Sequence, residues 1–138
     1  SVGAIVILPT RELASQVASI ASCFAKHTNF PSHELVGGSN QTLSEELLQK
    51  NGGNLLVASP GRLKETLTSK KPLLRVSDLL LLVLDEADRL LEMGFQATLN
   101  SIFRFLPKQR RTGLFSATMG SAVADLARAG LRNPRRGT

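Results

Sequence analysis

The chain has 138 residues, a length that suits one domain and is short for two. Seventeen Lys and Arg residues outnumber eleven Asp and Glu residues, and the net charge of +6 favours polyanionic partners without identifying one. Trp and Tyr are absent, which argues against an aromatic platform that stacks on the bases of single strands. Nucleic-acid binding by this chain would therefore rest on phosphate contacts.

The single cysteine, Cys23, excludes an internal disulfide and fits a reducing, intracellular environment. Because Cys23 lies among Val17, Ile20 and Phe24 at helical spacing, we expect a small core residue rather than a nucleophile. The first residues show no signal peptide, and the longest apolar run is far shorter than a bilayer requires. We therefore expect a soluble protein with no membrane partner.

Short apolar runs predict the strands of this chain. In chain order they are Gly3–Leu8, a weaker candidate at His33–Val36, Asn54–Ala58, Leu79–Leu84 and Thr112–Phe115. The runs are nearly continuous rather than strictly alternating, a pattern typical of strands that are covered on both faces.

Amphipathic stretches between these runs predict helices. In chain order, they carry the stripe Leu13, Val17, Ile20 and Phe24; a capping box of Thr42 and Glu45 before Leu47 and Leu48, stopped by 51–53; the pair Leu63 and Leu67; the stripe Phe95, Leu99, Ile102, Phe103 and Leu106; and Val123, Leu126 and Ala127, ending at Gly130. Alternation of strands and helices indicates an open α/β domain, a parallel sheet with helices on both faces.

Five polar or glycine-rich segments follow the predicted strands directly. They are "PTRELA" (9–14), "GG" (37–38), "SPGR" (59–62), "DEAD" (85–88) and "SAT" (116–118). In a parallel sheet all carboxyl ends of the strands share one rim, and open α/β folds bind their ligands there. We therefore expect these five segments to converge on one surface.

Several residues of these segments suit an anionic ligand. Thr10 and Ser59 stand just before helices, where free N–H groups and the helix dipole attract phosphate. Arg11 and Arg62 add charged groups at the same places. Three glycines would let a ligand approach the backbone closely, namely Gly37, Gly38 and Gly61. The alternative is that Thr10 and Ser59 only cap helices and the glycines only make turns.

The carboxylates of "DEAD" end the most apolar strand, where like charges would repel one another unless they met a cation or acted as a base. A carboxylate at such a position can hold Mg²⁺, directly or through water, while a neighbouring one positions or deprotonates a water molecule. Asp85 and Glu86 could divide these tasks, and Asp88 could accept hydrogen bonds from Ser116 and Thr118. The alternative is an acidic first turn that only favours its helix, by ~0.3–1 kcal/mol for each group.

Other polar residues are weaker candidates. His27 and His33 have no partners at metal-ligand spacing and are expected to be exposed or to lie in loops. Basic residues near the end of the chain are interpreted as solvated patches rather than as a site, namely Lys108, Arg110, Arg111, Arg132, Arg135 and Arg136.

The five segments, in this order, resemble those of the DEAD-box ATP-dependent RNA helicases. "DEADRLLEMGF" (85–95) is the most specific of the matches, and the likeness runs from Val2 to about Pro134. It implies a partial first domain, 1–138, of that family's two RecA-like domains, with the P-loop NTPase fold. "FLPKQRRTGLFSAT" and "RAGLRNP" further resemble the subgroup that assembles the large ribosomal subunit, which implies a nuclear or nucleolar location and pre-ribosomal protein partners.

The resemblance implies a role for each matching position. Asp85 would bind the Mg²⁺ of Mg-ATP, chiefly through water, and Glu86 would orient and activate the attacking water. Asp88 would pair with Ser116 and Thr118 and so couple the nucleotide state to the arrangement of the two domains. The remaining positions would contact the RNA backbone independently of base sequence, namely Thr10, Arg11, Gly37, Gly38, Ser59, Gly61 and Arg62.

One departure from the family pattern is large. No G-x-x-x-x-G-K-[ST] phosphate loop occurs in the sequence, which contains no Gly-Lys pair. The adenine-reading segment and the second RecA-like domain are missing too. We therefore interpret the chain as a fragment of a longer helicase and expect it to be inactive alone. Alternatives are a related DNA helicase or translocase and a non-catalytic RNA-binding scaffold; a carboxylate-metal nuclease would need further acidic or His ligands on the rim.

Overall fold

The structure is a computed structural model, and it describes residues 1–28, 30–36, 53–69 and 74–130. Its elements are β1 (Val2–Ile7), α1 (Arg11–Ala25), β2 (Ser32–Leu35), β3 (Asn54–Ala58), α2 (Pro60–Leu67), β4 (Leu81–Leu84), α3 (Ala87–Glu92), α4 (Gln96–Phe105), β5 (Arg111–Leu114) and α5 (Ser121–Gly130). Each predicted strand is present, although β4 begins two residues later than its apolar run. The predicted helix after Thr42 lies outside the described residues.

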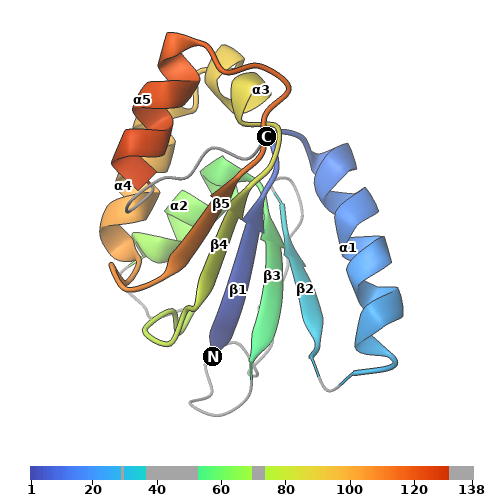
Figure 1. Cartoon of the computed structure of the whole chain (residues 1–138). Coiled ribbons are helices and arrows are strands. Elements are labelled where there is room, and N and C mark those ends of the chain that lie inside the picture. Colours follow the sequence, from blue (N-terminus) through green and yellow to red (C-terminus); the bar gives the residue numbers. More distant parts are fainter. Residues whose placement is uncertain (29, 37–52, 70–73, 131–138) are drawn as a thin grey trace.

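The described strands form one parallel sheet in the order β2-β3-β1-β4-β5 (Figure 1). β1 is the central strand, and Ile7 at its end pairs with Ala58 of β3 and with Leu84 of β4. Leu84 in turn pairs with Leu114 of β5. The carboxyl ends of the strands are thus level with one another, which confirms the predicted open α/β sheet.

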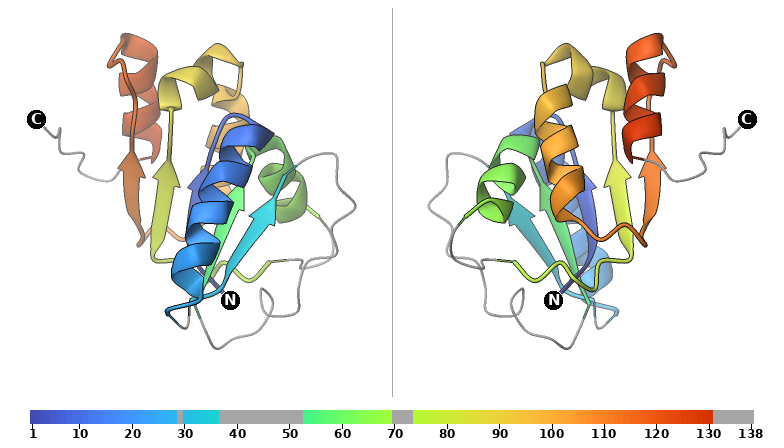
Figure 2. Two further views of the ribbon diagram at one scale, coloured as in Figure 1. Left: turned by 90° about the vertical axis from the view of Figure 1, so that its right-hand side faces the viewer. Right: turned by 90° about the vertical axis from the view of Figure 1, so that its left-hand side faces the viewer.

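Helices lie on both faces of the sheet. α1 packs against β2 and β3 on one face, whereas α2, α4 and α5 pack together on the other face. The two views of Figure 2 show this arrangement, with α1 toward the viewer in one and α4 in the other. The main core lies between the sheet and α2, α4 and α5, and its fully buried side chains include Ile5, Ile7, Leu82, Leu84 and Leu99.

The apolar stripe of α1 is only partly used, so the prediction for this helix is wrong in its second half. Ile20 and Phe24 are 60% and 68% exposed, and the buried residues are Ala14 and Ala18. Small side chains on this face let the helix approach β2 and β3 closely. Cys23 is exposed rather than buried. It follows Ala14 by nine residues and, at about 100° per residue, lies on the opposite side of the helix.

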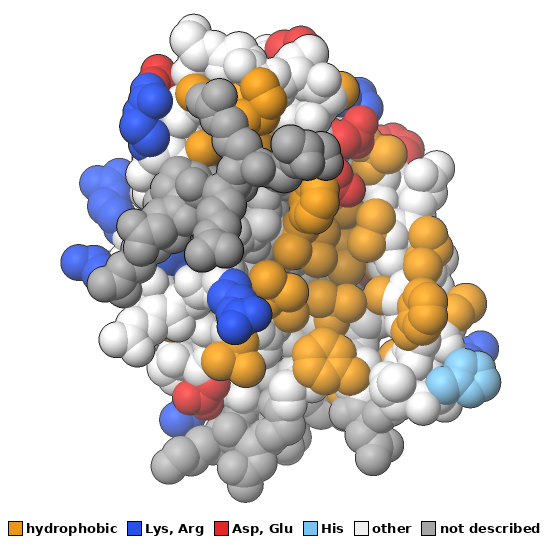
Figure 3. All heavy atoms as spheres, viewed as in Figure 1, with side chains coloured by type: hydrophobic (Ala, Val, Ile, Leu, Met, Phe, Trp, Pro, Cys, Tyr) orange, Lys and Arg blue, Asp and Glu red, His pale blue; other side chains and the backbone are white. Residues whose placement is uncertain are grey.

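β4 is covered on one face only within the described part of the chain. Leu82 and Leu84 are buried in the core, whereas Leu81 is 40% exposed and Val83 is partly exposed. The expectation that both faces of this strand are covered is therefore wrong for these residues. Val6, Leu81, Val83 and Phe115 form an apolar surface that we call the open sheet face, and Figure 3 shows hydrophobic side chains gathered over the middle of the sheet.

Two further observations bear on the predictions. Among the described residues, no helix has the length and apolar character needed to cross a membrane. His33 is not a loop residue: it lies in β2, where its Nε2 is 3.0 Å from Oδ1 of Asn54 on the neighbouring strand.

Candidate functional site

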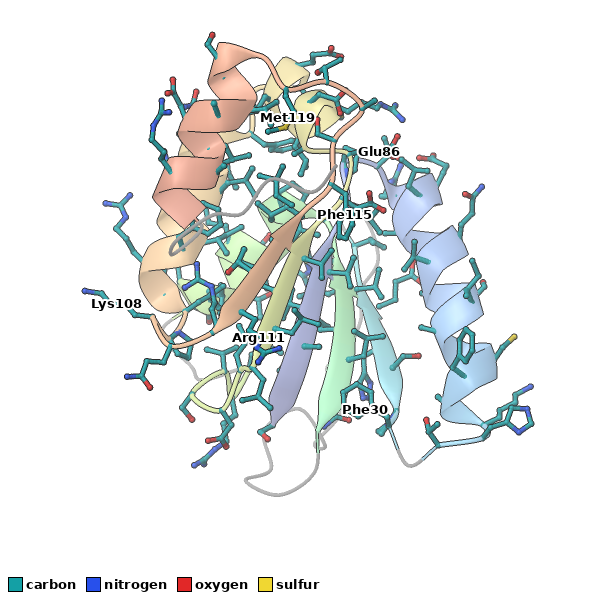
Figure 4. All side chains as sticks on the ribbon, in the orientation of Figure 1. Phe30, Glu86, Lys108, Arg111, Phe115 and Met119 are labelled. Atoms are coloured by element: carbon teal, nitrogen blue, oxygen red, sulfur yellow. The ribbon has the colours of Figure 1, made fainter. Side chains whose placement is uncertain are left out.

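The polar segments that follow β1, β3, β4 and β5 lie along one edge of the sheet. The level pairing of Ile7, Ala58, Leu84 and Leu114 places the residues after them at this edge, which we call the rim. Figure 4 shows Glu86, Phe115 and Met119 together at the rim, and Phe30, Lys108 and Arg111 toward the opposite end. Gly37 and Gly38, which were expected at the rim as well, lie outside the described residues.

The rim contains a crevice between the ends of β1 and β4. The helix after β1 lies on one face of the sheet, and α4, which follows β4 and the short α3, lies on the other. The connections leaving two neighbouring strands therefore diverge, which is the arrangement at which open α/β sheets bind ligands. Asp85 is the first residue after β4, and its N–H donates to the Ile7 oxygen at 3.0 Å. This bond places Asp85, which carries the carboxylate, at the crevice.

Glu86 has an unusual backbone conformation. Its φ of 52° and ψ of 51° place it in the left-handed region, and it is the one non-glycine residue with positive φ in the described chain. Its N–H donates to Asp85 Oδ1 at 2.9 Å, and its Oε1 lies 3.6 Å from Nη1 of Arg89. A residue with such backbone strain persists only where the surrounding structure holds it in place. Residues of this kind cluster at active sites.

Hydrogen bonds connect the start of α3 to the segment after β5. The N–H of Ala87 donates to the Phe115 oxygen at 2.9 Å, and the N–H of Asp88 donates to Ser116 Oγ at 3.2 Å. Thr118 Oγ1 donates to Asp88 Oδ2 at 3.4 Å. We call these three bonds the DEAD–SAT contact. The expected partners do meet, although Ser116 accepts from the Asp88 backbone instead of donating to its carboxylate.

Thr10 and Ser59 both stand at the N-terminal caps of helices, but only Thr10 makes a capping bond. Thr10 Oγ1 accepts from the N–H of Leu13 at 3.2 Å. Ser59 makes no side-chain capping bond, and Pro60 follows it as the first helical residue. The capping interpretation therefore describes Thr10 and leaves the Ser59 hydroxyl available at the rim.

A pocket of about 570 Å³ connects three segments of the rim. It is lined by Pro9, Arg11, Ser59, Gly61, Arg62, Glu65 and Phe95. Arg62 donates from Nη1 to Glu65 Oε1 at 2.9 Å, while its buried Nε has no hydrogen-bond partner. A side chain at Gly61 would meet no atom within 4 Å, so the backbone is open to a ligand there.

The sequence interpretation missed Phe95 as a residue of this pocket. Its spacing with Leu99 and Leu106 assigned it to the apolar stripe of a helix, and it does pack partly against the core. It lies just before α4, after Gly94, whose φ of +85° turns the chain. The Gly-Phe pair at the end of "DEADRLLEMGF" was the available signal for this position.

The carboxylate oxygens at the crevice suit a magnesium ion that arrives with a phosphate ligand. No group of three or more His, Cys, Asp or Glu side chains that could hold a metal by itself occurs in the described residues. Mg²⁺ needs no such group when it keeps several waters and shares phosphate oxygens with one or two carboxylates. Asp85 fits this requirement, because only its Oδ1 accepts a described hydrogen bond.

Comparisons with known proteins identify the family to which this sequence is similar. A family model described as DEAD/DEAH box helicase matches residues 1–126. The ATP-dependent RNA helicase DDX55 of Homo sapiens is 53% identical over 98% of the chain, and that of Xenopus laevis is 51% identical over 98%. An Arabidopsis thaliana protein, DEAD-box ATP-dependent RNA helicase 49, is 50% identical over 94% of the chain.

Solved structures show the same likeness. The S. cerevisiae Dbp5 protein, in a complex that contains ADP, matches 98% of this chain with a TM-score of 0.82 and 29% identity. A DEAD box protein from Methanococcus jannaschii matches 96% with a TM-score of 0.81 and 30% identity. The chain spans 23–24% of the length of the three curated relatives and 34–36% of the two solved chains. This chain belongs to the DEAD/DEAH box helicase family, and its sheet is that of the first, RecA-like domain.

Proposed function

We propose that this chain is part of the first RecA-like domain, 1–138, of an ATP-dependent RNA helicase that remodels RNA duplexes or ribonucleoproteins. The observation that carries the proposal is the DEAD–SAT contact beside a strained Glu86 at the crevice of the sheet. A scaffold that only binds RNA needs neither a water-activating carboxylate nor a hydrogen-bonded connection between two rim segments. The curated relatives carry the name of ATP-dependent RNA helicases, which supports RNA over DNA.

Asp85 and Glu86 divide the catalytic work in this proposal. Asp85 would hold Mg²⁺ through water, and the ion, when bound, would supply neutralisation of charge on the phosphates of ATP. Glu86 orients the attacking water and accepts its proton. The two carboxylates have different described partners: Oε1 of Glu86 lies 3.6 Å from Nη1 of Arg89, whereas Oδ1 of Asp85 accepts from the Glu86 N–H.

The DEAD–SAT contact couples the nucleotide state to the RNA-bound arrangement of the two RecA-like domains. Asp88 lies two residues after Glu86, while Ser116 and Thr118 leave β5 on the neighbouring part of the rim. A change in the position of Asp85 or Glu86 on ATP binding therefore moves the segment after β5 through hydrogen bonds. The second RecA-like domain of the longer protein is the partner that reads this movement.

The pocket at Arg11 and Arg62 takes the RNA backbone. Ser59 offers a hydroxyl, Gly61 offers exposed backbone, and the two guanidinium groups supply charge. Thr10 contributes as the cap that fixes the start of α1, and Gly37 and Gly38 complete the RNA-facing set. Contacts of this kind read phosphate and sugar rather than bases.

The catalytic proposal is tested with Glu86→Gln in the longer protein. Loss of a positioned general base lowers turnover by about 10²–10⁴-fold, so RNA-stimulated ATP hydrolysis should fall by that factor while RNA affinity is kept. The 138-residue chain alone should show no such turnover, since it has no Gly-Lys phosphate loop. Turnover of the variant within about threefold of wild type would reject the role of Glu86.

The RNA proposal is tested with Arg62→Gln. Loss of one phosphate contact should reduce the slope of log K against log salt by about 0.7–1, equally for RNAs of different sequence. Lys64→Gln is the matched control, because it removes a charge from the same helix outside the pocket. An unchanged slope in Arg62→Gln, or an equal change in both variants, would count against phosphate contact by Arg62. Competition between RNA and DNA strands of equal length decides between the two nucleic acids.

Work on large-ribosomal-subunit assembly in the nucleolus is part of the proposal. The segments at 105–118 and 128–134 resemble that subgroup, and pre-ribosomal proteins are then the partners. Association of the tagged longer protein with large-subunit precursor RNA, measured by crosslinking, is the expected result. Crosslinks confined to other RNAs would contradict this assignment.

A further inference from the structure

The end of the molecule opposite to the rim contains a second, basic pocket. It has a volume of about 710 Å³ and lies between the C-terminal ends of α4 and α5. Asn100, Phe103, Arg104, Lys108, Arg110 and Gly130 contribute to its wall. No carboxylate is among its lining residues. We call it the α4–α5 pocket, and Lys108 marks its position in Figure 4.

Arg110 is held rigidly in this wall. Its Nη1 donates to the Pro107 oxygen at 2.8 Å and its Nη2 to the Gly130 oxygen at 3.3 Å. Its guanidinium carbon lies 5.7 Å from the centre of the Phe103 ring. The prediction of a solvated basic patch is therefore wrong for Arg110, whose partial burial lowers the pKa of the guanidinium.

Within the described part of the chain, the charge of Arg110 has no carboxylate to balance it. No acidic side chain of the described residues lies within salt-bridge distance, and its buried Nε has no hydrogen-bond partner. Oδ1 of Asn100, in the same wall, is also buried without a partner. Buried polar groups that lack partners are rare in folded proteins and call for an explanation.

Two exposed cations extend this charge toward solvent. Arg104 belongs to the last turn of α4, and Lys108 follows it in the turn before β5. The helix dipole stabilises cations near helix C-termini, and this accounts for exposed residues such as Arg104. The dipole also accounts for the bond from Arg110 to the Gly130 oxygen at the end of α5, but it leaves the buried Nε of Arg110 and the buried Oδ1 of Asn100 without partners in the described chain.

We propose that the α4–α5 pocket binds an acidic segment of a partner protein, in which carboxylates flank an apolar side chain. The carboxylates pair with Arg104, Lys108 and Arg110, and the apolar side chain covers Leu106 and Ala129 in the lining. Forked guanidinium groups suit carboxylates, and charge complementarity supplies the specificity. This site is independent of the proposed function, because it lies away from the rim.

A protein segment fits the pocket better than RNA does. RNA phosphates would use the cations but would leave the apolar lining uncovered, and Phe103, which is 9% exposed beneath Arg110, offers no face for base stacking. The lining combines cations with the apolar side chains of Leu106 and Ala129, a mixture that complements an acidic peptide with one apolar anchor.

The test measures binding of a labelled peptide, in which aspartates flank one leucine, to the 138-residue chain by fluorescence anisotropy. Arg104→Glu combined with Lys108→Glu should weaken binding at least about tenfold, since attractive pairs become repulsive. The control is Lys26→Glu with Lys64→Glu, which makes the same change in net charge outside this pocket, and it should change affinity less than about threefold. Replacing the leucine of the peptide by serine should weaken binding as well.

Each other outcome would overturn the proposal. Equal losses in the pocket variant and the control variant would show general charge attraction. A polyuridine RNA that loses binding to the pocket variant, while the peptide does not, would assign the surface to nucleic acid. Absence of peptide binding to the unmodified chain would reject the site directly. If charge reversal unfolds the chain, as circular dichroism would show, Arg104→Gln with Lys108→Gln takes its place and should weaken binding about threefold or more.

Discussion

Glu86 shows how one strained residue can serve a site. A left-handed backbone costs a non-glycine residue roughly 1–2 kcal/mol, and glycine avoids most of that cost. The N–H of Glu86 donates to Asp85 Oδ1, and its carbonyl oxygen accepts from the N–H of Leu90 at 3.0 Å, so both ends of the residue are fixed. A glycine here would suit the backbone better but would remove the carboxylate from the crevice.

This strain predicts a difference between two variants of the 138-residue chain. Glu86→Gly should be more stable than Glu86→Ala by about 1 kcal/mol, because both lose the carboxylate and only alanine retains the strain. Urea unfolding followed by circular dichroism measures the difference. Equal free energies of unfolding would mean that the backbone at Glu86 relaxes freely.

The proximity of rim residues that are far apart in sequence could be predicted only from the predicted parallel sheet. The proximity of Asp88 to Thr118 follows from a shared rim and neighbouring strands, and the structure contains their hydrogen bond. The direction of the Ser116 bond was not predictable, because it depends on how α3 starts, with the Asp88 N–H toward β5. Arg110 was mispredicted for a similar reason, since its carbonyl partner at Gly130 lies on α5.

At the scale of elements, α1 and α2 each have a hydroxyl residue at the N-terminal cap position, Thr10 and Ser59, but only Thr10 makes a capping bond. Thr10→Ala removes a hydrogen bond to the Leu13 N–H and should destabilise the chain by about 1 kcal/mol. Ser59→Ala removes no capping bond and should change stability by less than about 0.5 kcal/mol. Thermal unfolding of both variants tests this contrast, and a loss at Ser59 equal to that at Thr10 would contradict it.

Apolar periodicity predicted where the helices lie better than it predicted which of their side chains are buried. α4 buries Leu99, Ile102 and Phe103 as its stripe predicts, because it packs between α2 and α5 over the sheet. α1 has an equally clear stripe, yet it packs on β2 and β3 through alanines. Periodicity gives the spacing of an apolar face but not which of two adjacent faces meets the sheet. In α1 the buried residues are Ala14 and Ala18, and Leu13 and Val17 are only partly buried.

At the scale of the whole molecule, the open sheet face sets the behaviour of the chain in solution. Phe115 is 60% exposed, and its ring lies beside Gly113 and near Val83. Contiguous apolar surface of this kind favours association. The 138-residue chain should therefore self-associate as its concentration rises, despite a net charge of +6.

Sedimentation velocity tests this prediction. Leu81→Lys should shift the chain toward monomer, because it places a charge in the open sheet face. Phe105→Lys, an equal change in charge at an exposed residue of α4, should have a smaller effect. A chain that stays monomeric without either change would show that the open sheet face does not drive association.

The central place of β1 in the sheet has a consequence for folding during synthesis. β1 is made before both of its neighbours in the described sheet, and one of them, β4, begins at Leu81, 74 residues after Ile7. At translation rates of 5–20 residues per second, that edge of β1 waits roughly 4–15 s for its partner. An apolar strand whose edge stays open for so long is a substrate for the chaperones that bind nascent chains.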